Sequence, residues 1–194
     1  MQATLPSRVL AGAVLPRTTW VTAVSVAGFA LLTAAAAQLS INLPFTPVPI
    51  TGQTFAVLLS GAALGSAAGG ASQLLYVGLG AVGLPFYAEG RSGWEAATGT
   101  TGGYLIGFVV ASYLVGLLAE RRQDRNVLGA IPAFLTANAV IYLFGVPWLA
   151  NVLEVPWQEA IALGATPFVI GDLAKIVLAG VLLPTAWRLV RPGS

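Results

Sequence analysis

No charged residue occurs between Arg17 and Glu89, and this run is far longer than the roughly 20 residues that an apolar helix needs to cross a bilayer. Two further uncharged runs cover residues 96–119 and 126–153. Over the 194 residues, 57% are hydrophobic and 8% are charged, whereas about 25% are charged in an ordinary soluble domain. The charge-free runs therefore predict an integral membrane protein that crosses the bilayer several times.

Helices are the expected form of these spans. Strands of a membrane barrel alternate polar and apolar residues, and runs such as "YLIGFVVASYLVGLLA" do not alternate. The first uncharged tract is too long for one crossing, and the small-residue turn around "GSAAGG" divides its second half. We predict an all-α single membrane domain, 1–194, with a short cytoplasmic segment over about 1–18 and six helices at about 19–41, 52–64, 68–83, 102–119, 127–149 and 167–188.

The arginines predict the orientation of these six helices, because cytoplasmic flanks of membrane spans carry an excess of Lys and Arg. Only Arg91 falls on one side, and Lys175 lies within a span. The other side holds Arg8, Arg17, Arg121, Arg122, Arg125, Arg188 and Arg191. Both termini are therefore expected in the cytoplasm, and the loops at 42–51, 84–101 and 150–166 are expected outside.

The first 40 residues also resemble a signal peptide, because an apolar stretch is followed by the small residues "AAAAQ". The stretch at 19–41 is nevertheless long enough to span, and the distribution of arginines is consistent when it is retained. We therefore expect the mature chain to begin near Met1.

Asp172 and Lys175 stand three residues apart inside the apolar run "PFVIGDLAKIVLAGVLLP". Ionisable groups within a span usually face the bundle interior or a cavity and mark a substrate or ion site. At this spacing the two side chains share one helix face and can neutralise each other. A purely structural ion pair, with Lys175 extending toward the membrane surface, is the alternative. Because Arg91 and polar loops are expected at the same end of the bundle, we favour a binding site.

The segment "PFTPVPITGQT" is expected to be a stiff strap over that site, since Pro44, Pro47 and Pro49 exclude a helix. A plain connector is the alternative. Gln53 and Thr54 follow at the start of the next expected helix, where they could bind a ligand or only cap the helix end.

Small residues recur at four-residue spacing and let helices approach closely. For most of them we expect packing inside the bundle. The residues are Gly61, Gly65 and Gly69, Gly99, Gly103, Gly107 and Ala111, and Ala30 and Ala34 on the first expected helix.

The chain contains no histidine and no cysteine, which removes imidazole bases, thiol nucleophiles and the usual ligands of zinc, haem and iron–sulfur clusters. Motifs of the types GxxxxGK[ST], HExxH and GxSxG are also absent. We therefore expect no enzyme, no cofactor and no metal. Nucleic acid is not an expected partner, because the basic residues flank apolar runs instead of forming a patch.

Five segments in order resemble the BioY family, the biotin-binding S components of energy-coupling factor (ECF) vitamin transporters. They are "AAAAQLSINLPFTPVPITGQTFAVLLSGAALG", "LYVGLGAVGLPFYAEGRSG", "TGTTGGYLIGF", "IYLFGVPWLA" and "GDLAKIVLAGVLLP", and they span nearly all of residues 30–185. Two positions depart from the family pattern. Thr100 stands where the family's GPTGGY has proline, and Glu89 lies in a loop where members vary, so contacts in that loop transfer poorly.

The resemblance implies a six-helix protein of the bacterial cytoplasmic membrane that captures biotin from outside. It further implies partners, namely a membrane coupling subunit and two ATPases that energise uptake, with docking through an AxxxA-like first helix, here Ala30 and Ala34. Biotin offers N–H donors, a carbonyl, a carboxylate and apolar parts, so its recognition calls for an anion, cations and apolar walls. Asp172, Lys175 and Arg91 would supply the charges and Gln53 hydrogen bonds, with walls from Tyr87, Phe86 and Trp94. The alternative for these three aromatic residues is a role as anchors at the membrane interface.

Three other functions fit parts of this pattern. A solitary or ion-coupled secondary transporter of biotin or a similar vitamin would use Asp172 as a proton relay. An intramembrane enzyme is disfavoured by the missing His and Cys. In a purely structural membrane subunit, Asp172 and Lys175 would only form an ion pair with each other.

Overall fold

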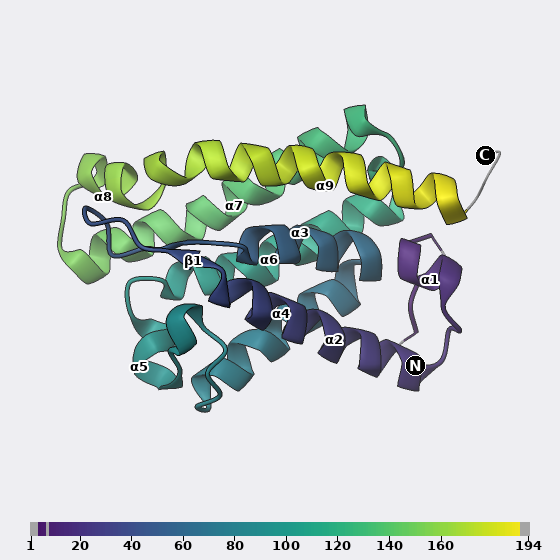
Figure 1. The fold of residues 1–194 in the computed structure, drawn as a ribbon, viewed down its shortest axis with the longest axis horizontal. Coiled ribbons are helices and arrows are strands. Elements are labelled where there is room, and N and C mark those ends of the chain that lie inside the picture. Colours follow the sequence, from purple (N-terminus) through teal and green to yellow (C-terminus); the bar gives the residue numbers. More distant parts are fainter. Residues whose placement is uncertain (1–3, 7, 191–194) are drawn as a thin grey trace.

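The computed structural model describes residues 4–6 and 8–190, and over this part of the chain the fold is a bundle of helices (Figure 1). The six helices that were expected are present, so the all-α membrane fold is confirmed. They are α2 (Thr19–Gln38), α3 (Gln53–Leu64), α4 (Ser66–Ala81), α6 (Gly102–Glu120), α7 (Val127–Leu153) and α9 (Val169–Val190).

Short elements fill the connections, including the 150–166 segment, which was expected to be a linker and instead contains the end of α7 and a helix of its own. These elements are α1 (Leu10–Val14), α5 (Gly93–Thr98), α8 (Trp157–Gly164) and the 3₁₀ turns η1 (Ala88–Gly90), η2 (Gln123–Arg125) and η3 (Thr166–Phe168). Two short strands, β1 (Ser40–Ile41) and β2 (Ile50–Thr51), pair antiparallel with Ser40 opposite Thr51. They close the base of the proline-rich strap.

Four helical stretches of the described chain are long and apolar enough to cross a membrane: Thr19–Gln38, Gly102–Glu120, Val127–Leu153 and Trp157–Val190. Helices α3 and α4 are shorter, and only Gly65 separates them. Gly65 has φ = 86°, a left-handed conformation that costs glycine little, and this allows the chain to reverse within one residue. The pair therefore forms a tight hairpin within the bundle.

Close approach of helices depends on the small residues, as expected. A Cβ atom on Gly69 would lie 2.8 Å from the Cα atom of Gly61, and one on Gly107 would lie 2.9 Å from the Cα atom of Ile141. Such separations leave no room for a side chain, so α3 meets α4, and α6 meets α7, through backbone contact. The glycine spacing is thus explained by packing within the chain.

Ala30 and Ala34 also lie inside the bundle, and here the expectation of an exposed docking surface needs correction. Ala30 has no exposed surface and Ala34 is 7% exposed, and both belong to the main apolar core. The outer face of α2 instead carries exposed residues such as Leu31 and Leu32. Because α2 is apolar on every side, its sequence did not indicate which face turns inward.

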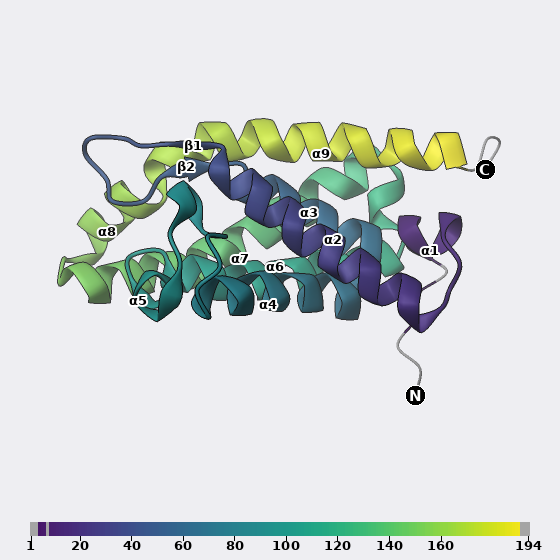
Figure 2. The same cartoon turned by 60° about the horizontal axis from the view of Figure 1, so that its bottom comes forward.

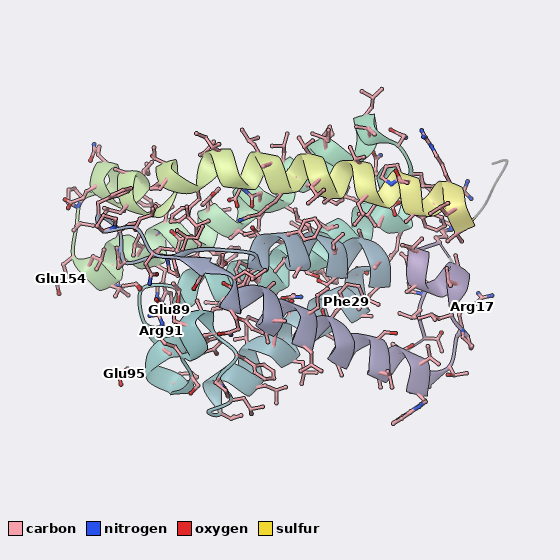
Figure 3. All side chains as sticks on the ribbon, viewed as in Figure 1. Arg17, Phe29, Glu89, Arg91, Glu95 and Glu154 are labelled. Atoms are coloured by element: carbon pink, nitrogen blue, oxygen red, sulfur yellow. The ribbon has the colours of Figure 1, made fainter. Side chains whose placement is uncertain are left out.

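The two ends of the bundle differ in charge and in structure. In Figure 1, α1 and the last turns of α9 lie at one end, whereas α5, α8 and the strands lie at the other. Figure 3 shows the Arg17 side chain at the first end and Glu89, Arg91, Glu95 and Glu154 at the second. The strands, α5 and α8 thus gather at one end, which the distribution of arginines predicts to be the outer one.

Candidate ligand-binding site

Asp172 is buried in the first turn of α9, with 4% of its surface exposed, and four side-chain donors surround its carboxylate. Oδ1 accepts hydrogen bonds from the Thr54 hydroxyl (3.2 Å) and the Lys175 ammonium (3.0 Å). Oδ2 accepts from the Asn138 amide nitrogen (3.1 Å) and from the Tyr142 hydroxyl. A carboxylate offers about four acceptor positions, so this group is held in one orientation by α3, α7 and α9 together.

Lys175 lies one turn further along α9 and forms an ion pair with Asp172 at 3.0 Å between Nζ and Oδ1. Its Nζ also donates to the Thr54 hydroxyl oxygen at 3.0 Å. The Lys175 side chain is 20% exposed, compared with 6% for that of Asp172. The predicted pairing is therefore present, and the ammonium group lies on the more accessible side of the pair.

Gln53, the first residue of α3, adds a neutral hydrogen-bonding group nearby and is 7% exposed. Its amide nitrogen donates to the Tyr76 hydroxyl at 2.5 Å, and its amide oxygen accepts from the Thr51 hydroxyl at 2.7 Å. The amide is thus fixed by the strand β2 on one side and by α4 on the other.

Tyr87 forms part of an aromatic wall in the loop between α4 and α5. Its hydroxyl donates to the carbonyl oxygen of Val77 at 2.7 Å, and its ring packs edge-on against Tyr76 with centroids 5.9 Å apart. Burial raises the pKa of Tyr87 to about 12, so the hydroxyl stays protonated and remains a donor. The residue presents an apolar ring with its polar end already bound.

Arg91 lies at the accessible edge of the site, with 43% of its side chain exposed. Its Nε is 3.6 Å from a carboxylate oxygen of Glu89, and Figure 3 shows the two side chains next to each other. The other oxygen of Glu89 accepts a hydrogen bond from the Asn42 amide on the strap. Arg91 is therefore linked through Glu89 to the segment that covers the site.

The strap over residues 42–49 is anchored at its tip. The Thr46 hydroxyl donates to the carbonyl oxygen of Leu163 in α8 at 2.8 Å, and in Figure 2 this loop reaches beyond β1 and β2 toward α8. Val48 and Pro49 from its return arm line the site. The proline-rich segment is thus part of a wall as well as a connector.

These groups surround a single pocket that encloses about 690 Å³, including the part open at its mouth. All five predicted site residues line it, namely Asp172, Lys175, Arg91, Gln53 and Tyr87. The remaining lining residues are Val48, Pro49, Thr51, Thr54, Ala88, Ala96, Thr101, Tyr104, Leu105, Phe108, Ile141, Tyr142 and Phe168.

The arrangement is suited to binding a small molecule that is partly polar and partly apolar. One end of the pocket offers an anion and a cation in contact, the mouth offers a guanidinium group, and aromatic and aliphatic side chains lie between them. In the described part of the chain, no group of three or more His, Cys, Asp or Glu residues could hold a metal ion.

The sequence of the chain matches the model of the BioY family over residues 10–192. The chain belongs to the BioY family. The biotin transporter BioY of Thermotoga maritima is 37% identical over 142 residues, which cover 73% of this chain and 82% of that protein. The probable biotin transporter BioY of Pyrococcus horikoshii is 37% identical over 158 residues, or 81% of this chain and 90% of that protein.

A crystal structure of the S-component for biotin from an ECF-type ABC transporter has the same fold as this BioY-family chain. The TM-score is 0.78 at 25% sequence identity, and the match covers 86% of this chain and 90% of the other. The fold, and not only the sequence pattern, is therefore shared with the family.

Two polar residues that hold Asp172 in this BioY-family site were not predicted from the sequence. Asn138 and Tyr142 stand four residues apart in the apolar run "AFLTANAVIYLFG", and both donate to Oδ2 of Asp172. Polar side chains at this spacing share one helix face. An amide and a hydroxyl one turn apart inside a span were therefore a usable signal for a second wall of the site.

Two aromatic residues were expected as walls and do not line the pocket. Trp94 is 74% exposed, and Phe86 stacks on Tyr76 with ring centroids 6.5 Å apart. Phe108, Tyr104 and Phe168 supply aromatic walls in their place. These residues come from α6 and η3, whose contribution to the pocket depends on how the helices pack.

Proposed function

We infer that this chain is a biotin transporter of the membrane and acts as the substrate-binding S-component of an ECF-type system. Membership of the BioY family and the shared fold of the biotin S-component support this inference. The observation that carries it is the buried pair of Asp172 and Lys175 at one end of a pocket with apolar walls. A pair of opposite charges inside a membrane bundle is costly unless it has a use, and a polar ligand gives it one.

The chemistry of biotin suggests a division of roles within the pocket. The four donors present fill the acceptor positions of Asp172, so a ring N–H group would take the place of the Thr54 hydroxyl, whose contact is the longest at 3.2 Å. The freed Thr54 hydroxyl and Lys175 would serve the ring carbonyl. Because Lys175 carries three protons and two of them are directed at Asp172 and Thr54, one donor remains for a ligand. The thioether ring and alkyl chain contact side chains such as Phe108 and Ile141.

The carboxylate of biotin is assigned to Arg91 at the mouth. Arg91 now contacts Glu89 at a distance of 3.6 Å, which is a weak and solvent-exposed pairing. A ligand carboxylate that takes the place of Glu89 would keep the guanidinium neutralised and would free the Asn42 amide as well. The contact between Asn42 and Glu89, and with it the position of the strap, would then depend on the ligand.

Uptake against a gradient needs energy from partners, since the chain has no phosphate-binding loop. We assign this role to a membrane coupling subunit with two ATPases. We propose that they dock on the open face of α2. The exposure of Ala23 and the partial exposure of Ala27, at the four-residue spacing that favours close helix contact, support this proposal. This face replaces the buried Ala30 and Ala34.

The direct test is a calorimetric titration of the purified chain with biotin in detergent, with biotin methyl ester as a comparison ligand. Saturable binding of biotin, and weaker binding of the uncharged ester, is the expected result. Absence of biotin binding to folded protein would refute the inference. Uptake by liposomes that contain only this chain, and that stops when a proton gradient is collapsed, would favour the solitary transporter instead.

A further inference from the structure

A second cavity lies at the opposite end of the bundle, between the connection that follows α6 and the last turns of α9. It encloses about 850 Å³, including its open part, and is lined by Arg122, Arg125, Pro184, Trp187 and Arg188. The guanidinium-bearing residues Arg122 and Arg188 are exposed, whereas Pro184 and Trp187 are buried. The cavity therefore combines a firm apolar floor with a positively charged rim.

The floor is fixed by an acid and an aromatic ring. Asp124 is 2% exposed, and its Oδ2 accepts a hydrogen bond from the indole nitrogen of Trp187 at 2.6 Å. The Arg125 guanidinium lies 4.3 Å from the centroid of the Trp187 ring, and its Nη2 donates to the carbonyl oxygen of Arg8 at 3.3 Å. These contacts tie η2 to α9, so the walls keep their positions.

The charges around this cavity do not cancel. Three arginines line the cavity, and the negative charge of Asp124 can neutralise one of them. Arg125 follows Asp124 directly in the chain. The ion pairs found in the described part of the chain, residues 4–6 and 8–190, are Arg91–Glu89 and Lys175–Asp172. Arg122 and Arg188 thus belong to neither pair, and a bound anion would relieve the repulsion between them.

The surroundings indicate what kind of anion fits. Leu128 is 89% exposed and Leu189 is 79% exposed. They are close in sequence to the residues that line the cavity, and they lie in the first turn of α7 and the last turn of α9. In a membrane protein such residues face lipid. The arginines therefore lie at the level where a span meets the headgroups, next to apolar surface that acyl chains cover.

We propose that the cavity formed by Arg122, Arg125, Trp187 and Arg188 binds the phosphate-bearing headgroup of an anionic phospholipid. Arg122 and Arg188 donate to the phosphate oxygens, because guanidinium groups match phosphate geometry with paired hydrogen bonds. The acyl chains lie against α7 and α9 around Leu128 and Leu189. This site is independent of the biotin pocket, which lies at the other end of the bundle.

Native mass spectrometry of the purified chain with added phosphatidylglycerol or phosphatidylcholine of the same acyl chains tests this site. We expect tighter binding of phosphatidylglycerol, and the double variant Arg122→Asn/Arg188→Gln should weaken it on the order of tenfold. Asparagine suits the left-handed backbone of Arg122, which has φ = 67°, so the turn is preserved. The double variant Arg122→Lys/Arg188→Lys keeps both charges and should retain more of the affinity than the neutral variant.

The control is the double variant Arg17→Gln/Arg121→Gln, which removes two exposed charges that do not line the cavity. Its lipid affinity should change by less than about twofold, because such charges act only through a screened field. An equal loss of lipid affinity in the neutral cavity variant and in this control would overturn the site. Equal affinity of the unmodified chain for the two lipids would overturn it as well. Displacement of the lipid by equimolar inorganic phosphate or hexaglutamate would overturn the lipid assignment, in favour of a free anion or an acidic protein partner respectively. Unchanged biotin affinity in each variant shows that the fold is intact.

Discussion

The Tyr142 hydroxyl donates a hydrogen bond to Oδ2 of Asp172, the oxygen that also accepts from Asn138. Lys175 and Thr54 occupy the opposite oxygen, Oδ1. The two oxygens of one carboxylate are therefore divided between α7 on one side and α3 with α9 on the other. The orientation of Asp172 in the pocket is set by residues that come from three helices.

Tyr142→Phe removes one donor from this carboxylate and leaves the ring in place. Hydrogen bonds to charged groups contribute about 1.5–3 kcal/mol, and part of this is recovered by the remaining donors. We expect biotin to bind about three- to tenfold more weakly in calorimetric titrations. Tyr113→Phe is the matched control, since Tyr113 is 46% exposed on α6 and should change the affinity little.

Asp172→Asn retains the shape of the side chain but removes the charge that Lys175 faces. Loss of a charge-assisted hydrogen bond, at about 1.5–3 kcal/mol, should weaken biotin binding at least roughly tenfold. Calorimetry at fixed pH measures this directly. An unchanged affinity would mean that Asp172 and Lys175 form only a structural pair.

The topology of the chain is open to chemical labelling, because the sequence has no cysteine. A single cysteine at Gln123, in the connection after α6, should react with a membrane-impermeant thiol reagent only from the cytoplasmic side. A cysteine at Glu95 in α5 should react only from outside. Labelling of residue 123 from the outside alone would contradict the predicted orientation.

Ala30→Trp should damage the fold, because Ala30 has no exposed surface and α2 cannot move outward without losing its core contacts. Overpacking of this kind costs about 1–3 kcal/mol, occasionally more, and should lower the thermal midpoint and biotin binding together. Ala23→Trp changes an exposed position on the same helix. It should leave biotin binding within about threefold and abolish association with the coupling subunit. If neither variant loses association with the coupling subunit, the docking surface lies on another helix.

Asp124 predicts a pH dependence of stability. Burial raises the pKa of Asp124 in the folded chain, whereas the unfolded value is about 3.9. Between the unfolded and the folded pKa, the folded state therefore binds more protons than the unfolded state. The contribution of Asp124 to the free energy of unfolding falls as the pH rises through this range. Asp124→Asn keeps an acceptor for Trp187 and should flatten the decline. The difference in thermal midpoint between the two proteins, measured from about pH 4 to pH 7, should therefore widen with pH.

The sequence predicted the fold well because the relevant signal is coarse. Charge-free runs indicated the number of spans, and the small-residue segment "GSAAGG" indicated the turn between α3 and α4. Asp172 and Lys175 were equally visible, since ionisable residues are rare in an apolar span. Such features depend on composition along the chain and not on how the helices pack.

The inward and outward faces of the helices were less predictable. In soluble helices the polar face marks the outside, but α2 is apolar all round, so Ala30 and Ala34 looked as available as Ala23 and Ala27. The aromatic walls show the same difficulty, because Phe108 and Phe168 enter the pocket only through the packing of α6 and η3, whereas Trp94 points outward. These assignments need the tertiary structure.

The short length of α3 sets the depth of the ligand pocket. With 12 residues this helix is only about 18 Å long, whereas the hydrocarbon core of a bilayer is about 30 Å thick. The missing height lies above Gln53, where the pocket and its strap take the place that two further turns would fill. The binding space within the membrane thus exists because α3 is too short to span the hydrocarbon core. Each turn added to or removed from the start of α3 would change the length of the molecule that the pocket can hold by about 5 Å.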